Sequence, residues 1–208
     1  MIRVKICGIR EAVGYDTAVD AGADDIGFNF FPPSPRAVTP AVAAALSARH
    51  PGGPCRVGLF VAPSDDEIAA VLAVVPLDVL QLYVDAARAA EVRARFGLPV
   101  WRAVGVAVAA DLPVAMDGVD RLLIETKAPK DATRPGGNAA TFDWTLLRGW
   151  RAPGPWLLAG GLTAGNVAAA IGVTGAVHVD VSSGVESAPG HKDPALIRGF
   201  VAAARAAQ

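Results

Sequence analysis

The chain has few cysteines, no excess charge of either sign and no long apolar run. Cys7 and Cys55 are too few for a disulfide framework and predict reduced thiols in the cytoplasm. The 19 basic residues nearly balance the 20 acidic ones, which argues against nucleic acid or an anionic membrane surface as a partner. No apolar run reaches the roughly 18 residues that cross a bilayer. We therefore expect a cytoplasmic protein with neither kind of partner.

Strand and helix patterns alternate eight times along the 208 residues. Such alternation implies parallel pairing, and eight units in one domain over residues 1–208 fit a compact (βα)8 TIM barrel. A doubly wound open α/β sheet is the alternative, but it usually has fewer strands and would leave two units unplaced. The predicted strands are Val4–Cys7, Asp25–Phe30, Arg56–Val61, Val79–Tyr83, Val100–Val106, Arg121–Glu125, Trp156–Ala159 and Ala176–Val181.

Helices are expected between these strands, and one carries a clear start signal. Ser64 with Glu67 three residues later forms a capping box for a helix through Val75. A long loop is expected over Thr126–Thr141. The other predicted helices are Arg10–Ala21, Pro40–Arg49, Asp85–Phe96, Trp144–Trp150, a helix from Thr163 or Ala164 to Gly172, and Pro194–Ala206.

Polar residues stand on the predicted strands where a barrel would place its active site. Side chains alternate along a strand, so polar residues two apart share a face, which we expect to point into the barrel mouth. The alternative is that some are buried structural groups, above all Lys5 and His178. The pairs on one face are Lys5 with Cys7, Gln81 with Tyr83, and His178 with Asp180.

Cys7 is a candidate catalytic group, as a nucleophile or a base, because it ends the first strand before a glycine turn. A thiol needs a depressed pKa to act near neutral pH, and Lys5 on the same face could supply it. The alternative is an inert buried thiol, which is what most buried cysteines are.

Two loops near the end of the chain predict a phosphate site. Gly160-Gly161 follows the seventh strand, and Ser182-Ser183-Gly184 follows the eighth. Glycines allow close backbone approach, and barrels often bind phosphate with the loops after these two strands. The pair of loops is a stronger signal than either alone.

Seven ordered motifs are spread over nearly the whole chain. They are Val4-Lys-Ile-Cys-Gly-Ile9, Ala21-Gly-Ala-Asp-Asp-Ile-Gly-Phe28 with Pro32-Pro-Ser-Pro-Arg36, Val57-Gly-Leu-Phe-Val61, Leu80-Gln-Leu82, Thr141-Phe-Asp-Trp144, Ala159-Gly-Gly-Leu162 with Asn166-Val167, and Val179-Asp-Val-Ser-Ser-Gly-Val-Glu186 with Pro189-Gly190 and Lys192-Asp193. Together they resemble the phosphoribosylanthranilate isomerase family of tryptophan biosynthesis. The resemblance implies the barrel already counted and a phosphorylated small molecule as substrate.

The resemblance also implies residue roles in an Amadori rearrangement, which turns an N-ribosyl aldose phosphate into a 1-amino-1-deoxy ketose without cofactor or metal. Cys7 aligns with the family's base, and Glu125 stands where the family has its acid. Arg36 would lie near the substrate's aromatic carboxylate and Asp180 near its nitrogen. The other residues expected to bind the substrate are Lys5, Gln81, Tyr83 and His178. We expect the protein to be a monomer or homodimer.

Four features depart from the family pattern. Glu125 replaces an aspartate, Tyr83 replaces a histidine, His178 replaces a small residue, and the loop 136–141 lacks a lysine. His178 is therefore a second candidate for the general acid. The departures keep two other functions open: a paralogous isomerase or lyase acting on a related phosphorylated amino sugar, and a catalytically silent barrel that binds a phosphosugar.

Overall fold

The computed structural model describes residues 1–128 and 143–207, and its central feature is a closed barrel of eight parallel strands. Each strand pairs with the next along the chain, and β8 closes the barrel on β1 through the pairing of Lys5 with Asp180. The (βα)8 prediction is confirmed. The strands are β1 Arg3–Cys7, β2 Asp25–Asn29, β3 Cys55–Val61, β4 Val79–Tyr83, β5 Val100–Val106, β6 Arg121–Thr126, β7 Trp156–Leu158 and β8 His178–Val181.

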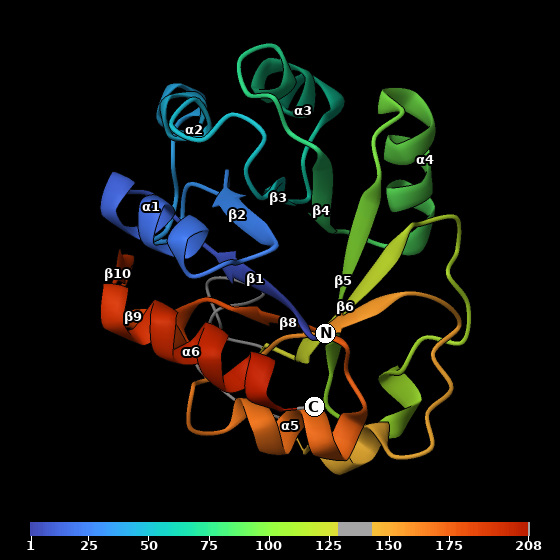
Figure 1. Cartoon of the computed structure of the whole chain (residues 1–208). Helices are drawn as coiled ribbons and strands as arrows, with labels where there is room; N and C mark the ends of the chain where they lie inside the picture. Colours follow the sequence, from blue (N-terminus) through green and yellow to red (C-terminus); the bar gives the residue numbers. More distant parts are fainter. Residues whose placement is uncertain (129–142, 208) are drawn as a thin grey trace.

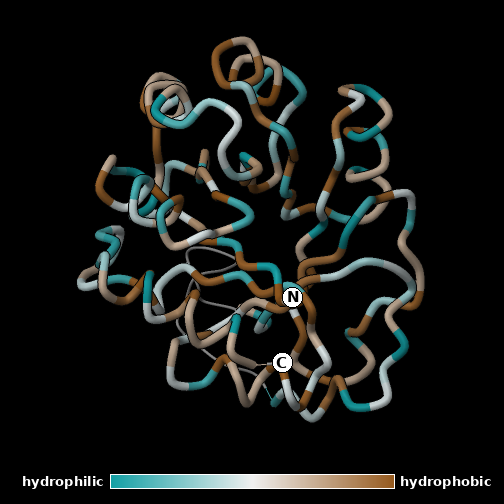
Figure 2. The backbone as a smooth tube through the Cα atoms, in the orientation of Figure 1, coloured by the Kyte–Doolittle hydropathy of each residue, from teal (hydrophilic) through white to brown (hydrophobic). Residues whose placement is uncertain are grey.

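Helices surround the barrel, as Figure 1 shows, and in Figure 2 hydrophobic and hydrophilic segments alternate along both the strands and the helices. The capping box at Ser64 is confirmed, because Ser64 Oγ accepts from Glu67 N while Glu67 accepts from Ser64 N. The α-helices are α1 Ala12–Asp20, α2 Pro40–Ser47, α3 Asp65–Leu72, α4 Ala86–Phe96, α5 Val167–Thr174 and α6 Pro194–Ala206.

One local prediction was wrong, and one small element was not predicted. The helix expected over Trp144–Trp150 is a short 3-10 turn, η2 Trp144–Leu147, held by Asp143 at its start. A small hairpin of β9 Glu186–Ala188 and β10 His191–Lys192 follows the turn η3 Ser183–Val185 and was not predicted. Its strands have three and two residues, too few for an alternating pattern to be recognised.

The barrel interior is layered. A band of apolar side chains fills its middle, and polar side chains lie on either side of this band along the strands. Since inward-facing residues lie two apart, a shift of two residues moves a side chain by about 6.6 Å along its strand. The band consists of Val57, Val79, Trp101, Leu123, Leu157 and Ala159.

A further 3-10 element, η1 Ala109–Asp111, lies in the connection after β5. The predicted loop Thr126–Thr141 lies for the most part outside the described residues. None of the helices in the described ranges is long and apolar enough to span a membrane.

Candidate active site

Cys7 lies at the carboxyl end of β1, and its side chain shares the barrel interior with Lys5 and Asp180. Lys5 Nζ donates to Asp180 Oδ1 at 2.7 Å. All three residues are buried, with Lys5 fully so. Lys5 and Asp180 lie opposite each other where β1 pairs with β8, and this pairing brings the three groups together, as their positions in the sequence predicted.

Lys5 does lower the pKa of Cys7, but the net depression of that pKa expected from the sequence is wrong. Burial raises the pKa of the Cys7 thiol and outweighs the lowering effect of the Lys5 charge, while Asp180 raises it further. The pKa of Lys5 is itself raised because Asp180 stabilises the ammonium. The lysine charge is thus largely neutralised by the carboxylate beside it, which a sequence pattern cannot show.

Glu125, at the end of β6, is a buried carboxyl group that keeps its proton at neutral pH. Burial raises the pKa of Glu125 to about 8, while its hydrogen bond with the Tyr83 hydroxyl acts in the opposite direction. The negative charge of Asp180 raises it further. A carboxylic acid with this pKa is suited to donate a proton near pH 7.

Gln81 faces the same interior from β4, two residues before Tyr83. Its side chain is buried, and neither the oxygen nor the nitrogen of its amide has a hydrogen-bond partner among the described residues. An unsatisfied buried amide is costly, on the order of 1–3 kcal/mol. A bound polar molecule would satisfy it, which fits the predicted role of Gln81 in substrate binding.

His178 shares the inward face of Asp180, as predicted, but lies at the opposite end of the apolar band. Its Nε2 is 2.9 Å from Asp25 Oδ2, and Arg121 Nη1 is 3.1 Å from its Nδ1. The edge of the His178 ring meets the Trp101 ring at 5.6 Å between centroids. The hypothesis that His178 is the acid or a substrate contact is corrected by this position near the amino ends of the strands.

The neighbours of His178 also determine its charge. A guanidinium can only donate, so Nδ1 must accept from Arg121, which leaves the proton of a neutral ring on Nε2, beside Asp25. Burial lowers the pKa of His178 and outweighs the raising effect of Asp25. His178 is therefore a neutral structural link between two oppositely charged groups.

Arg36 follows β2 in the proline-rich loop, which Ser34 orders by bonds to Asn29 and to the Arg36 backbone. Its buried guanidinium donates from Nε and Nη2 to the two carboxylate oxygens of Glu186, at 2.7 and 2.8 Å. Its proximity to a substrate carboxylate stays a prediction.

The two glycine-containing loops meet at the carboxyl ends of β7 and β8. Gly160 and Gly161 both have positive φ, of +90° and +63°, which suits glycine in a tight turn. Gly184 lies so close to the Leu162 carbonyl that an added Cβ would overlap it. Ser182 Oγ donates to the Cys7 carbonyl at 3.1 Å. Ser183 begins η3 directly after it, so all five predicted phosphate residues belong to adjoining loops at the Cys7 end of the barrel.

Glu186 and Lys192 were not singled out from the sequence, although both stand in the motifs quoted above. Lys192 Nζ donates to Glu186 Oε1 at 2.8 Å and to the Ser182 carbonyl at 2.9 Å, and both side chains are almost completely buried. A glutamate and a lysine six residues apart are usually exposed charged residues, so nothing in the local sequence indicated that these two are buried.

A family model described as N-(5'-phosphoribosyl)anthranilate (PRA) isomerase matches residues 4–203. A curated N-(5'-phosphoribosyl)anthranilate isomerase of Acidiphilium cryptum is 59% identical over 209 residues, covering all of both chains. The crystal structure of phosphoribosyl anthranilate isomerase from Thermotoga maritima superposes with a TM-score of 0.86 at 35% identity, over 99% of this chain and 100% of that one.

A further solved structure is a phosphoribosyl anthranilate isomerase in complex with reduced 1-(o-carboxyphenylamino)-1-deoxyribulose 5-phosphate. It is 33% identical to this chain with a TM-score of 0.83, and the match covers 99% of this chain and 100% of that one. Fold, motifs and relatives agree over almost the full length. The chain belongs to the N-(5'-phosphoribosyl)anthranilate isomerase family.

Proposed function

We propose that this chain isomerises N-(5'-phosphoribosyl)anthranilate to the 1-deoxyribulose 5-phosphate ketose, with Glu125 as general acid and Cys7 as general base. The observation that carries these roles is a buried carboxyl group with a pKa of about 8 in the same barrel mouth as a thiol. The Lys5–Asp180 ion pair lies beside that thiol. Family membership supports the reaction.

The reaction needs one proton delivered and one removed. Glu125 gives its proton to the ribose ring oxygen while the bond from that oxygen to C1 breaks and the nitrogen lone pair forms C=N⁺. The Asp180 carboxylate stabilises the positive nitrogen. The thiolate of Cys7 then takes the C2 proton, and the electrons of that bond neutralise the nitrogen. The resulting enol becomes the ketone by moving a proton from its hydroxyl group to C1.

The remaining predicted site residues bind the substrate. Arg36 supplies a planar donor for the aromatic carboxylate, while Gln81 and Tyr83 offer an amide and a hydroxyl in the mouth. Gly160, Gly161, Ser182, Ser183 and Gly184 would surround the phosphate with backbone N–H groups. A crystal soaked in inorganic phosphate is expected to show an ion between these loops, and density only elsewhere would count against the site.

Complementation is the direct test of the function. The gene is expected to rescue growth without tryptophan in a bacterial strain that lacks this isomerase, and its Cys7→Ala variant is expected to fail. Rescue by neither, with the purified proteins folded, would favour another phosphorylated amino sugar as substrate. Rescue by both would remove Cys7 from the mechanism. A cytoplasmic location and a monomeric or homodimeric state stay predictions. Light scattering, which gives the molar mass of the purified protein, tests the oligomeric state.

A further inference from the structure

Glu186 is the centre of a buried ionic cluster that the mechanism above does not use. Its carboxylate accepts from Arg36 Nε and Nη2 at 2.7 and 2.8 Å, and from Lys192 Nζ at 2.8 Å. The Gly190 N–H adds a contact at 3.3 Å. The side chains of Glu186, Arg36 and Lys192 are 4%, 5% and 2% exposed. We call these three residues the Glu186 cluster.

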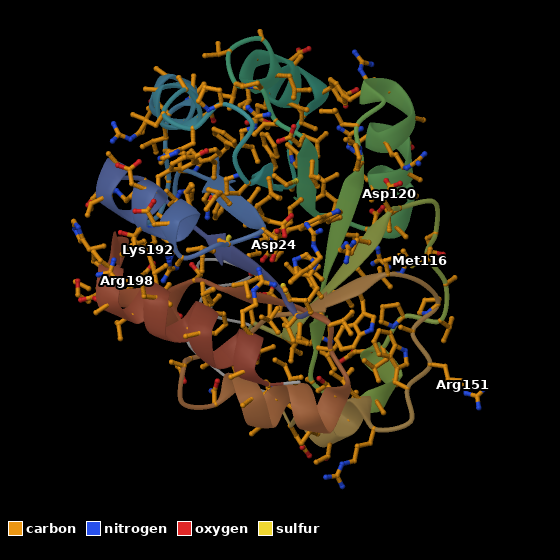
Figure 3. All side chains as sticks on the ribbon, in the orientation of Figure 1. Asp24, Met116, Asp120, Arg151, Lys192 and Arg198 are labelled. Carbon is orange, nitrogen blue, oxygen red and sulfur yellow. The ribbon has the colours of Figure 1, made fainter. Side chains whose placement is uncertain are left out.

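The cluster joins two parts of the candidate site that are 150 residues apart in sequence. On one side Glu186 accepts hydrogen bonds from Arg36, in the loop after β2. The aliphatic part of the Arg36 side chain packs against the backbone at Gly8. On the other side Lys192 donates to the carbonyl of Ser182, whose hydroxyl donates to the Cys7 carbonyl. Lys192, labelled in Figure 3, lies close to α1. A Cβ atom added to Gly14 of that helix would be 3.1 Å from the Cβ of Lys192.

The hydrogen bonds of the Glu186 cluster fix the orientation of the Arg36 guanidinium. A carboxylate that accepts from Nε and Nη2 fixes the plane of the guanidinium, because two parallel bonds leave it no rotation. A guanidinium held in a fixed plane suits recognition of a planar anion, and burial makes each contact stronger than at a surface.

We propose that Glu186 is a positioning residue that orients Arg36 for the carboxylate of the substrate's aromatic ring. This inference rests on the proposed role of Arg36. Glu186 does not touch the reacting atoms. It sets the plane and direction of the guanidinium, and thereby makes the enzyme selective for a ring that carries the carboxylate.

The test compares two ligands in Glu186→Gln. One is reduced 1-(o-carboxyphenylamino)-1-deoxyribulose 5-phosphate, and the other is the same compound without its carboxyl group. The variant is expected to lose roughly 10- to 100-fold in affinity for the first, the worth of a charge-assisted bidentate contact, and less than about twofold for the second. Equal losses for both ligands, or no loss, would overturn the proposal.

Control variants separate this role from a general loss of structure. Glu11→Gln removes a surface carboxylate that pairs with His191 of the same hairpin at 3.1 Å, and it is expected to leave both affinities unchanged. Glu186→Asp keeps the charge and should recover part of the selectivity. If Glu186→Gln does not fold, Glu186→Gln with Lys192→Met removes one charge of each sign, and the same ratio of affinities is measured.

A last variant separates the proposal from the proposed function. Arg36→Met should abolish the preference for the carboxylated ligand, and Glu186→Gln added to it should lower that preference no further, as expected for two residues acting on one contact. If Arg36→Met keeps the preference, the proposed role of Arg36 is wrong. If Arg36→Met loses it while Glu186→Gln keeps it, only the role of Glu186 is wrong.

Discussion

The ammonium nitrogen of Lys5 lies 2.7 Å from Oδ1 of Asp180 inside the barrel, so the lysine shares its charge with a carboxylate before it can act on Cys7. The ion pair leaves little net charge beside the thiol, and burial then dominates its pKa. The enzyme therefore rests with Cys7 in its thiol form.

Loss of the Asp180 charge is expected to lower the pKa of Cys7. Asp180→Asn removes a group that raises this pKa and leaves Lys5 without its counter-charge. Iodoacetamide should then alkylate Cys7 faster at pH 7 than in the unchanged protein, with the midpoint of the rate against pH moved downward. Mass spectrometry of the labelled peptide gives the rate.

Cys55 in the same samples is the internal control. Burial raises its pKa to about 12, with Asp25 as the next cause, and Asp180 is not among the groups that shift it, so its rate should not change with Asp180→Asn. Inorganic phosphate should slow only the reaction at Cys7. Equal rates at both cysteines, with no protection, would favour an inert thiol at position 7.

The pH dependence of kcat/KM should have an alkaline maximum. The reactive form needs Glu125 protonated, with a pKa of about 8, and Cys7 ionised, although its pKa is raised. When the base has the higher pKa of the two, kcat/KM rises with pH to about 8 and falls only above the pKa of the thiol. Rate measurements from pH 6 to 10 at low substrate check this, and a maximum below pH 7 would contradict it.

Glu125→Gln is expected to lower kcat by roughly 100- to 10,000-fold, the usual worth of a general acid, because the amide keeps the size but cannot deliver the proton. Glu125→Asp keeps the acid but retracts it by one methylene, and we expect a smaller loss. Steady-state kinetics on the two variants gives the ranking. Full activity in Glu125→Gln would remove Glu125 from the role of acid.

Glu125→Gln should also make the folded state more stable at high pH than that of the unchanged protein. The folded pKa of about 8 lies above the unfolded value near 4.3, so the folded state binds the extra proton between them and stability falls as pH rises through that window. By pH 7 the loss is on the order of 3 kcal/mol. In urea unfolding, the free energy of unfolding of Glu125→Gln should rise relative to that of the unchanged protein from pH 5 to pH 8. A difference that stays constant over this range would argue against a raised pKa of Glu125.

His178→Ala should cost stability and spare catalysis. It removes the neutral link between Arg121 and Asp25 on the far side of the apolar band, and leaving a buried hydrogen-bonding group without its partner costs about 1–3 kcal/mol. We expect kcat/KM to stay within about threefold, as for His50→Ala on the surface. A large loss of kcat in a variant that is still folded would return His178 to the active site.

The stability of the unchanged protein should also reveal His178 through pH. Its folded pKa is lowered, so the unfolded chain takes up a proton near pH 6.5 that the folded chain does not. Stability is therefore lost as pH falls below about 6.5, down to the folded pKa. Urea midpoints from pH 5 to 7.5 should show this slope, and the slope should be shallower in His178→Ala.

The barrel, its strands and the face of each polar side chain could be predicted from the sequence, because these follow from local periodicity. Parallel strands alternate with helices, and side chains alternate along strands, so Lys5, Cys7, Gln81 and Asp180 were placed inward without any knowledge of their neighbours. The motifs around Cys7 and after β8 carried the resemblance to the family, and a motif is also a property of the local sequence.

Tertiary structure alone decided the charge of each group and its depth in the barrel. The effect of Lys5 on Cys7 depended on Asp180, 175 residues later, and the place of His178 depended on the apolar band between it and the mouth. Glu186 gained a role only because folding brings Arg36 and Lys192 to its carboxylate. A pKa is set by burial and by charges within a few ångströms, and neither is a property of the local sequence.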